Sequence, residues 1–173
     1  AGALGREICG HKITATDDDL PELIAKFKNV LISLGQIKSA DVRKDLFERA
    51  KALGAELPVH VSPLGYVSPL AALDEGCIVM HQALINARAR VGANAIINTR
   101  ALVEHDVEIG PHCHISTGAL INGNCRVEEG CFVGSGAVLR EGVRLGARSV
   151  VGCGAVVLAD APAGSRVVGI WKG

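Results

Sequence analysis

The chain has 173 residues, of which 49% are hydrophobic, and its 18 basic residues balance its 18 acidic residues. Balanced charge excludes the basic footprint of a general nucleic-acid-binding protein, and five aromatic residues are too few for a platform on which bases stack. No apolar run reaches the roughly eighteen residues of a membrane span, and no charged-then-apolar secretion signal opens the chain. We therefore expect a cytoplasmic protein without nucleic-acid or membrane partners.

Residues 1–60 carry two helix patterns. The first covers 17–27 and begins with three consecutive Asp residues, which suit the positive N-terminal end of a helix. The second covers 39–54, where Ser39 is the expected N-cap and Gly54 the residue that ends the helix.

Two short apolar runs, 29–35 and 56–61, are predicted as strands. The alternation of helix and strand is typical of half of a nucleotide-binding sheet, so a small Rossmann-like α/β domain is expected, with a glycine-rich opening that resembles a phosphate-binding turn. A parallel crossover needs a dozen or more residues. We therefore expect this domain to be incomplete, with residues missing before Ala1 and near Ile8–Gly10.

From Val61 to Val157 every sixth residue is Val, Ile or Leu, through seventeen consecutive hexads. Residues six apart advance by about 600° around an α-helix and would not form a stripe, so this period excludes a helix. A hexapeptide period is the mark of a parallel β-helix, in which three hexads form one triangular coil. The fold is therefore predicted to be mainly β, with a parallel β-helix over 61–173.

Each place in the hexad has its own role. The aliphatic first residue points inward, the small fifth residue fills a corner, and Gly or Asn fits corners that need positive φ. Seventeen hexads make between five and six coils, about 27 Å long at the usual strand spacing. Because no hexad is interrupted, a site must use corner residues, another copy of the chain or residues 1–60. The flat outer faces are expected to meet other copies in a symmetric oligomer.

Cysteine positions favour core packing over disulfides or metal binding. Four of the six cysteines occupy the inward fifth place of their hexads, and no CxxC pair exists. These four are Cys77, Cys113, Cys125 and Cys131. Cys153 instead takes an outward third place, where it could line a groove.

Three of the six histidines lie within ten residues of one another. His105 takes the third place of its hexad, at an outward corner between Glu104 and Asp106. An imidazole beside a carboxylate on a rigid corner suits a general base, because the carboxylate orients the ring and stabilises its charged form. His112 and His114 take the fourth and sixth places of the next hexad and are also predicted to point outward. A solvated surface histidine is the alternative interpretation.

Residues 85–152 resemble the bacterial sugar O-/N-acyltransferases that are built as left-handed β-helices. The most similar branch N-acetylates nucleotide-linked 4-amino-sugars, together with its sialic acid O-acetyltransferase relatives. The most specific element is the motif EHD, followed nine residues after its histidine by the histidine of HIS. The family also carries a small Rossmann-like N-terminal domain, so the resemblance extends over nearly the whole chain.

The resemblance implies a role for each matching residue. His105 would be the general base, and Asp106 would raise its basicity. Asn98 would lie near the reacting amine, and His114 would contact the thioester region of acetyl-CoA.

The resemblance also implies a homotrimer, with acetyl-CoA as acyl donor and no metal. The donor would lie between neighbouring prisms and touch backbone near Ser135 and Cys153. Lys172 would bind its phosphates, with Arg148 and Arg166 as further candidates. The sequence GIWKG departs here from the Gly-Pro-Ala-Lys that usually closes the family's chains.

The implied acceptor is a nucleotide-linked amino-sugar. It would bind residues 1–60, a Rossmann-like nucleotide-sugar-binding domain, while residues 61–173 would form the acyltransferase domain. The residues that match the family's glycine turn are Gly2, Ala3, Leu4 and Gly5, with Leu4 where the family usually has histidine.

Three alternatives stay open. The first is a sialic acid type O-acetyltransferase, because the same base could take a proton from a hydroxyl acceptor. A γ-type carbonic anhydrase, with zinc between subunits, would pair two histidines five residues apart, whereas the close pairs here are His105 with His112 and His112 with His114. A non-catalytic assembly or regulatory protein is the third.

Overall fold

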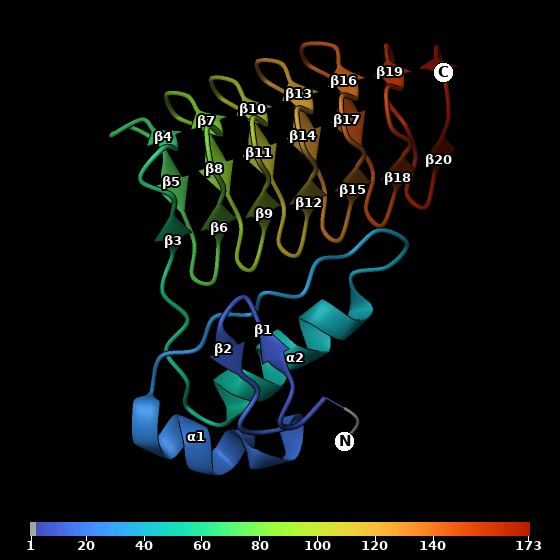
Figure 1. Ribbon diagram of the computed structural model, residues 1–173. Helices are drawn as coiled ribbons and strands as arrows, with labels where there is room; N and C mark the ends of the chain where they lie inside the picture. Colours follow the sequence, from blue (N-terminus) through green and yellow to red (C-terminus); the bar gives the residue numbers. More distant parts are fainter. Residues whose placement is uncertain (1–2) are drawn as a thin grey trace.

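The computed structural model describes residues 3–173, which form a small N-terminal region and a triangular prism of parallel strands (Figure 1). The N-terminal region begins with a hairpin, in which Cys9 and Gly10 both have positive φ and close a tight turn. Its elements are β1 (Glu7–Ile8), β2 (His11–Lys12), the 3-10 turn η1 (Asp17–Asp19), α1 (Leu20–Phe27) and α2 (Asp41–Ala52).

Both predicted helices are confirmed. In η1 the Asp19 carboxylate accepts the backbone N–H of Thr16 at 2.7 Å, which fixes the entry to α1. At α2 the Ser39 hydroxyl accepts the N–H of Asp41 at 3.1 Å, and Gly54 follows the helix with a φ of +82°. Both ends of α2 lie within two residues of the predicted ones, with Ala40 as the N-cap, one residue after the predicted Ser39. Helix α1 ends at the predicted Phe27 but begins three residues later than predicted, after η1.

The predicted strand over 29–35 is wrong. Its backbone pairs with other backbone only at one isolated parallel bridge, between Asn29 and Glu56. The carbonyls of Ile32 and Leu34 accept hydrogen bonds from the buried Arg43 guanidinium instead of from a neighbouring strand. No parallel sheet of paired strands forms among residues 3–59, so the Rossmann-like architecture is not confirmed.

The stretch from Ile8 to Gly10, where missing residues were expected, is crossed by the tight turn of the β1–β2 hairpin. A hairpin needs only two turn residues, whereas a parallel crossover needs a dozen or more. The glycine-rich opening therefore leads into a hairpin and not into a helix N-terminus.

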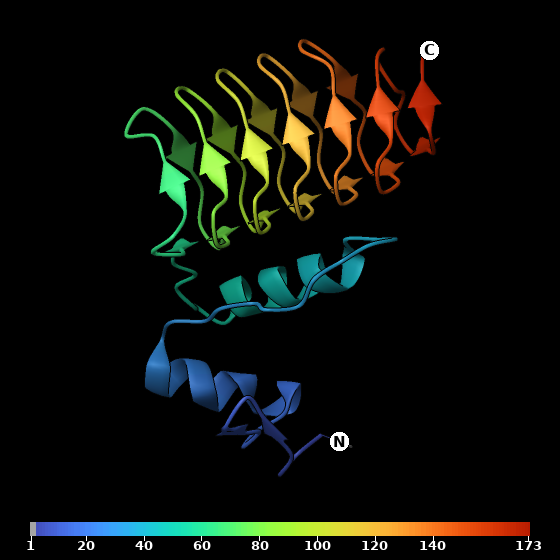
Figure 2. The same cartoon turned by 45° about the horizontal axis from the view of Figure 1, so that its top comes forward.

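Three parallel sheets form the sides of the prism (Figure 2). The first, named the covered face, contains β3 (His60–Val61), β6 (Ile78–Val79), β9 (Ile96–Ile97), β12 (His114–Ile115), β15 (Phe132–Val133), β18 (Val150–Val151) and β20 (Arg166–Val167). The second, named the apolar face, contains β4 (Tyr66–Val67), β7 (Leu84–Ile85), β10 (Leu102–Val103), β13 (Leu120–Ile121), β16 (Val138–Leu139), β19 (Val156–Val157) and β21 (Ile170–Trp171). The third, named the charged face, contains β5 (Ala72–Leu73), β8 (Arg90–Val91), β11 (Glu108–Ile109), β14 (Arg126–Val127) and β17 (Arg144–Leu145).

The register between coils follows the predicted hexads. Val103 pairs with Ile85 in the coil before and with Ile121 in the coil after, so paired residues are three hexads apart. The first-place residues form a continuous buried core, which includes Ile97 and Leu139, both fully buried. The four fifth-place cysteines belong to the same core, which confirms their structural role. A mainly β fold with a parallel β-helix is therefore confirmed.

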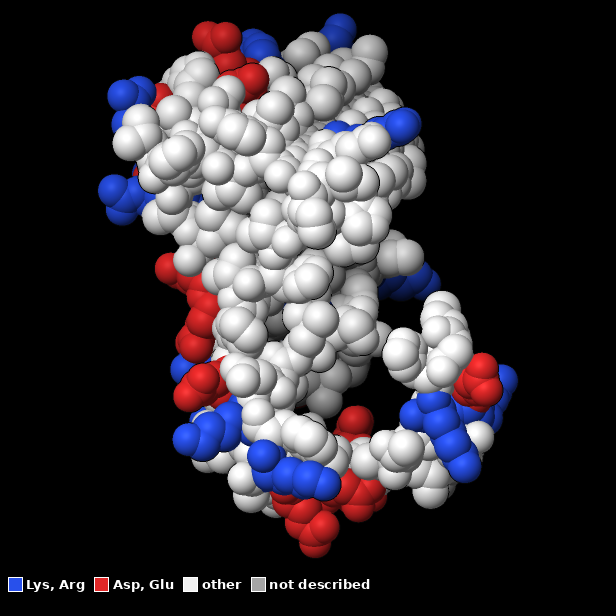
Figure 3. Space-filling view, turned by 60° about the vertical axis from the view of Figure 1, so that its left-hand side comes forward, with Lys and Arg blue, Asp and Glu red and all other residues white. Residues whose placement is uncertain are grey.

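The outward sixth-place residues give each face its chemistry. On the apolar face they are aliphatic or aromatic in every coil: Tyr66, Leu84, Leu102, Leu120, Val138, Val156 and Ile170. On the charged face they are mainly ionic: Ala72, Arg90, Glu108, Arg126 and Arg144. Figure 3 brings the first coil forward and shows mostly uncharged side chains on this end, where Leu64, Tyr66 and Leu70 are exposed.

Helix α2 lies beside the prism (Figures 1 and 2), and its contacts fall on the corner between the charged and covered faces. Phe47 contacts Gly76 and His112 at this corner, and Lys44 donates to the Glu129 carboxylate at 2.7 Å. One side of the prism is therefore occupied within the chain. No helix of the described residues has the length and apolar character needed to cross a bilayer.

We predict that Ile97→Ala lowers the free energy of unfolding by about 2–5 kcal/mol, because the removed atoms leave a cavity in a close-packed interior. Urea unfolding of the two proteins measures this difference. Arg90→Ala, on the outward place of the charged face, serves as the control and should change stability by less than about 0.5 kcal/mol. Equal effects of the two substitutions would contradict the inward assignment of the first hexad place.

Candidate functional site

His105 lies on the turn between β10 and β11, at the corner between the apolar and charged faces. Its side chain is 53% exposed, and Nδ1 donates to Oδ2 of Asp106 at 2.9 Å. The ring lies over Gly123 of the next coil, where a Cβ would come within 2.8 Å of Nε2. A larger residue at this place would displace the ring, so glycine leaves the space that the imidazole occupies.

Asp106 has a left-handed backbone, with a φ of 59°. Its carboxylate accepts two hydrogen bonds from the Arg88 guanidinium, at 2.6 Å from Nε and 2.8 Å from Nη2. The hydrogen bonds from Arg88 and then from His105 hold the pKa of Asp106 far below its usual range. The carboxylate therefore stays ionised and keeps the His105 proton on Nδ1, which leaves Nε2 as the acceptor.

Glu104 supports the same corner from the other side. Its carboxylate accepts the backbone N–H of His105 at 3.1 Å and the side-chain amide of Asn86 at 3.0 Å. The Asp106 carboxylate therefore holds the imidazole ring, while the Glu104 carboxylate holds the backbone of the same turn. No described residue hydrogen-bonds its Nε2.

His114 lies elsewhere, on the covered face, and is only 8% exposed. Its Nδ1 donates to the backbone carbonyl of Gln36 at 2.9 Å, and its Nε2 accepts from Nδ2 of Asn98 at 3.1 Å. Burial lowers the pKa of His114, which favours the neutral ring. The prediction that it points out of the prism is correct, but the N-terminal region covers it, which hexad position alone does not indicate.

His112 is also covered, with 6% of its surface exposed. Its Nδ1 accepts from Nδ2 of Asn94 at 2.9 Å, and its backbone carbonyl accepts from Nε2 of Gln36 at 2.6 Å. Burial lowers the pKa of His112. The outward direction is again correct, but the side chain belongs to the contact between α2 and the prism.

The buried Arg43 completes this contact. Burial lowers the pKa of Arg43 to about 10, and its Nε donates to the Asn94 carbonyl at 3.2 Å. These polar groups join the two regions of the chain and give the covered face its fixed partner.

The predicted donor-binding residues follow the corner between the covered and apolar faces. The Ser135 hydroxyl is 3.0 Å from that of Ser116, and Cys153 is exposed one coil further on. A Cβ at Gly134 would come within 2.6 Å of the Cys153 nitrogen, so the backbones approach closely here. Asn98 lies two coils before Ser135 on the covered face, near the same corner.

The remaining predicted residues are more dispersed. Gly2 lies outside the described residues, and Ala3, Leu4 and Gly5 form a turn in which Leu4 is 55% exposed. Lys172 is exposed at the end of the prism. Two further phosphate candidates are Arg166, which is exposed in β20, and Arg148, whose guanidinium lies 3.4 Å from Asp41.

One chain does not bring these residues together. His105 occupies one edge of the apolar face, while Ser135, Cys153 and Asn98 lie at or near the opposite edge. One side of the prism spans one hexad, so these two edges are up to roughly 20 Å apart at about 3.3 Å per strand residue. The predicted donor and base residues therefore lie on two separate corners of the same molecule.

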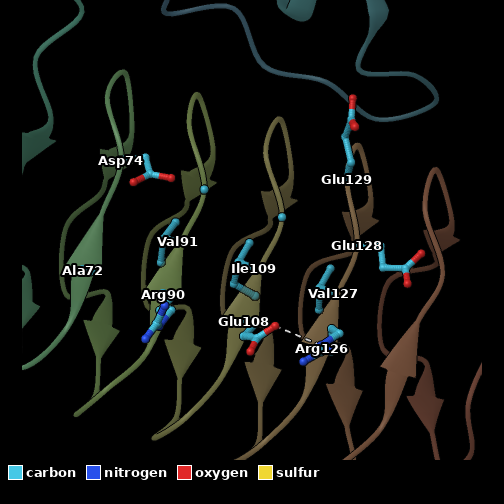
Figure 4. Close-up of a pocket in the computed structure, with 12 residues that line it drawn as sticks. Ala72, Asp74, Arg90, Val91, Glu108, Ile109, Arg126, Val127, Glu128 and Glu129 are labelled. Atoms are coloured by element: carbon cyan, nitrogen blue, oxygen red, sulfur yellow. Dashed lines mark ion pairs between the residues drawn. The ribbon is translucent and has the colours of Figure 1, made fainter.

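A groove with a volume of about 500 Å³ lies on the charged face, and His105 does not line it. Figure 4 shows Arg90, Glu108 and Arg126 in a row along it, with Glu108 and Arg126 paired at 2.9 Å. A row of paired opposite charges on an open face suits solvent better than a reacting centre. Among the residues described, no three His, Cys, Asp or Glu side chains lie together to hold a metal.

Sequence analysis missed Arg88 and Gly123, although the hexads contain a signal for both. Residues eighteen apart stack in adjacent coils, so Arg88 lies beside Asp106 and Gly123 beside His105. Counting eighteen residues forward and back along the sequence from each candidate residue would have found both.

The family description "Bacterial transferase hexapeptide (six repeats)" matches residues 88–123 and 124–159. A comparison with curated protein sequences finds no match.

Solved structures similar to this chain include the following three. PerB from Caulobacter crescentus, in complex with CoA and GDP-perosamine, is 32% identical with a TM-score of 0.86, over 94% of this chain and 81% of that one. The acetyltransferase domain of PglB from Neisseria gonorrhoeae is 32% identical with a TM-score of 0.83, over 90% of this chain and 75% of that one. WeeI from Acinetobacter baumannii, at 24% identity and a TM-score of 0.81, over 96% of this chain and 82% of that one, shares the fold. The chain therefore belongs to the bacterial hexapeptide transferases and is an acyltransferase of the sugar acetyltransferase type.

Proposed function

We propose that the protein transfers the acetyl group of acetyl-CoA to the amine of a nucleotide-linked 4-amino-sugar, with His105 as general base. The observation that carries this proposal is the exposed imidazole whose Nδ1 is bound by the fixed Asp106 carboxylate. Similar structures contain CoA and GDP-perosamine in PerB and acetyl coenzyme A in PglB. These ligands support the proposed donor and acceptor classes.

The reaction needs a proton acceptor beside the amine. Nε2 of His105 takes the amine proton as the nitrogen attacks the thioester carbonyl, and Asp106 stabilises the imidazolium that forms. Groove amides near Ser135 and Cys153 hold the oxyanion of the tetrahedral intermediate. The C–S bond then breaks, the CoA sulfur takes up the proton, and the N–acetyl bond remains.

We infer that the site is completed in a homotrimer of left-handed prisms. The apolar face carries exposed aliphatic or aromatic side chains along its length, with Tyr66 at 55%, Leu120 at 37% and Ile170 at 63% exposure. A continuous apolar column on a flat face favours burial against other copies. If three such faces turn toward one threefold axis, each corner that holds His105 meets the opposite corner of the next prism.

This arrangement would unite the two separated groups of residues. His105 and Asp106 of one copy would face Asn98, Ser135 and Cys153 of its neighbour across the seam. Acetyl-CoA in that seam would contact both copies, with Lys172 close to its phosphates. The neutral His114, held by Gln36 and Asn98, would turn its Asn98-bonded nitrogen toward the thioester.

Within this proposal the two regions of the chain have different functions. Residues 61–173 carry the transfer chemistry, and residues 1–60 bind the nucleotide part of the acceptor through the exposed turn around Leu4. The firm contact of α2 with the prism supports this division, because it holds the N-terminal region beside the covered face.

The proposal predicts thiol release from acetyl-CoA in the presence of one member of a panel of nucleotide-linked 4-amino-sugars. His105→Ala should lower kcat by about 10²- to 10⁴-fold, the usual contribution of a general base. Free thiol and the mass of the acetylated product are the measurements. His60→Ala, an exposed histidine at the start of the prism, should leave kcat unchanged.

The panel also separates the alternatives. Transfer to hydroxyl sugars alone would replace the amine acceptor by a hydroxyl acceptor, as in the sialic acid type enzymes. Saturable acetyl-CoA binding without turnover on any member would contradict an enzymatic role. Unchanged turnover in His105→Ala would remove this residue from the mechanism.

A shared site makes a separate prediction for mixed oligomers. His105→Ala and Asn98→Ala should each be nearly inactive, but trimers reassembled from equal amounts of both should regain about one quarter of wild-type activity. Three quarters of random trimers contain both variants, and one seam in three then combines an intact His105 with an intact Asn98. Turnover after joint refolding measures the recovery.

Each variant refolded alone is the control and should stay inactive. No recovery in mixtures whose mixed composition is verified by mass spectrometry would contradict a site shared between copies.

A further inference from the structure

The Arg88 guanidinium makes a contact that the proposed chemistry does not itself require. Its Nε and Nη2 bind the two oxygens of Asp106 at 2.6 and 2.8 Å, while Oδ2 of the same carboxylate also accepts Nδ1–H of His105 at 2.9 Å. The three side chains form a single line of charge-assisted hydrogen bonds that ends at the exposed imidazole. Bidentate pairing restrains both the position and the plane of a carboxylate.

The fourth place in the hexad does not by itself produce this bidentate contact with a carboxylate. Arg100 and Arg148 take the same fourth place in their hexads and have nearly the same φ, 58° against 60° for Arg88. Arg100 donates through Nε to the neutral Gln82 amide, and the Arg148 guanidinium lies 3.4 Å from Asp41. Of these three arginines, only Arg88 makes two hydrogen bonds to a carboxylate that also binds a histidine.

The orientation of the Asp106 carboxylate depends on its hydrogen bonds to Arg88. The Asp106 side chain is 28% exposed and the Arg88 side chain 71% exposed, so packing alone does not fix either of them. Gly123 supports the His105 ring from one side only, since its missing side chain leaves the space that the imidazole fills. The direction of Nε2 therefore rests on the Asp106 carboxylate, and the carboxylate rests on Arg88.

We propose that Arg88 is a positioning residue for acetyl transfer, which holds the Asp106 carboxylate against Nδ1 of His105. This inference rests on the proposed function, in which His105 is the base. Arg88 does not touch the reactants in it and acts only through Asp106.

The proposal separates kcat from KM. Loss of the bidentate contact lets the Asp106 carboxylate move, so the base is misplaced and kcat falls. The KM for the acceptor changes little, because Arg88 does not contact the acceptor in the proposed function.

The test compares kcat and KM of Arg88→Gln, Arg88→Lys and wild type across a range of pH, with the acceptor found in the panel. Arg88→Gln should lower kcat by about 10- to 100-fold, as for a misplaced catalytic group, and leave KM nearly unchanged. Arg88→Lys keeps the charge but cannot make the bidentate contact, so it should also lower kcat.

A double-mutant cycle with Asp106→Asn gives a readout that a merely structural Arg88 would not move. Once the carboxylate is gone, Arg88→Gln should cost no more than about a further twofold, because residues acting through one partner are not additive. Arg126→Gln, which breaks the exposed pair with Glu108 on the charged face, is the matched control and should leave kcat and the pH profile unchanged. Thermal unfolding of each variant checks that the prism is intact.

An intact Arg88→Gln with wild-type kcat would overturn the proposal, and so would additive losses in the cycle. Both outcomes are distinct from failure of the proposed function, in which wild type itself shows no turnover. If wild type is active but His105→Ala is equally active, the base assignment fails before Arg88 is tested.

Discussion

The burial of one aliphatic side chain in every hexad is the constraint on which the rest of the structure depends. The first-place residues from Val79 to Val157 lie in a single core with almost no exposed surface. Because a one-residue slip would turn this column outward, the register of the coils is fixed by hydrophobic burial. Every corner and face then has a set orientation, and a side chain such as His105 obtains its direction from the core beneath it.

The prism could be predicted almost residue by residue, since its stabilising pattern is local and repeats. The first-place column, the inward cysteines and the outward His105 all follow from hexad arithmetic. Stacking partners such as Arg88 follow from the same arithmetic extended by three hexads. These parts of the candidate site were accessible to sequence analysis because each residue's neighbours are set by a constant spacing.

The parts that failed depend on contacts between distant segments. The segment 29–35 has a strand-like composition, but a strand needs a neighbour, and here the Arg43 side chain takes the carbonyls that a neighbour would pair. His112 and His114 point out of the prism as expected, yet the packing of α2 and of the segment around Gln36 buries them. Periodicity defines a direction for each side chain and contains no information on what another segment places over it.

The unbroken spacing also limits how this chain can vary. Insertion of eighteen residues would add one complete coil and leave every downstream side chain on its original face. Insertion of six residues would rotate every later coil by one face. The column of ionic side chains on the charged face would then continue onto the apolar face or the covered face. Length variation in proteins of this architecture should therefore be tolerated in whole coils within the prism, or in loops at its corners that leave the count of hexads unchanged.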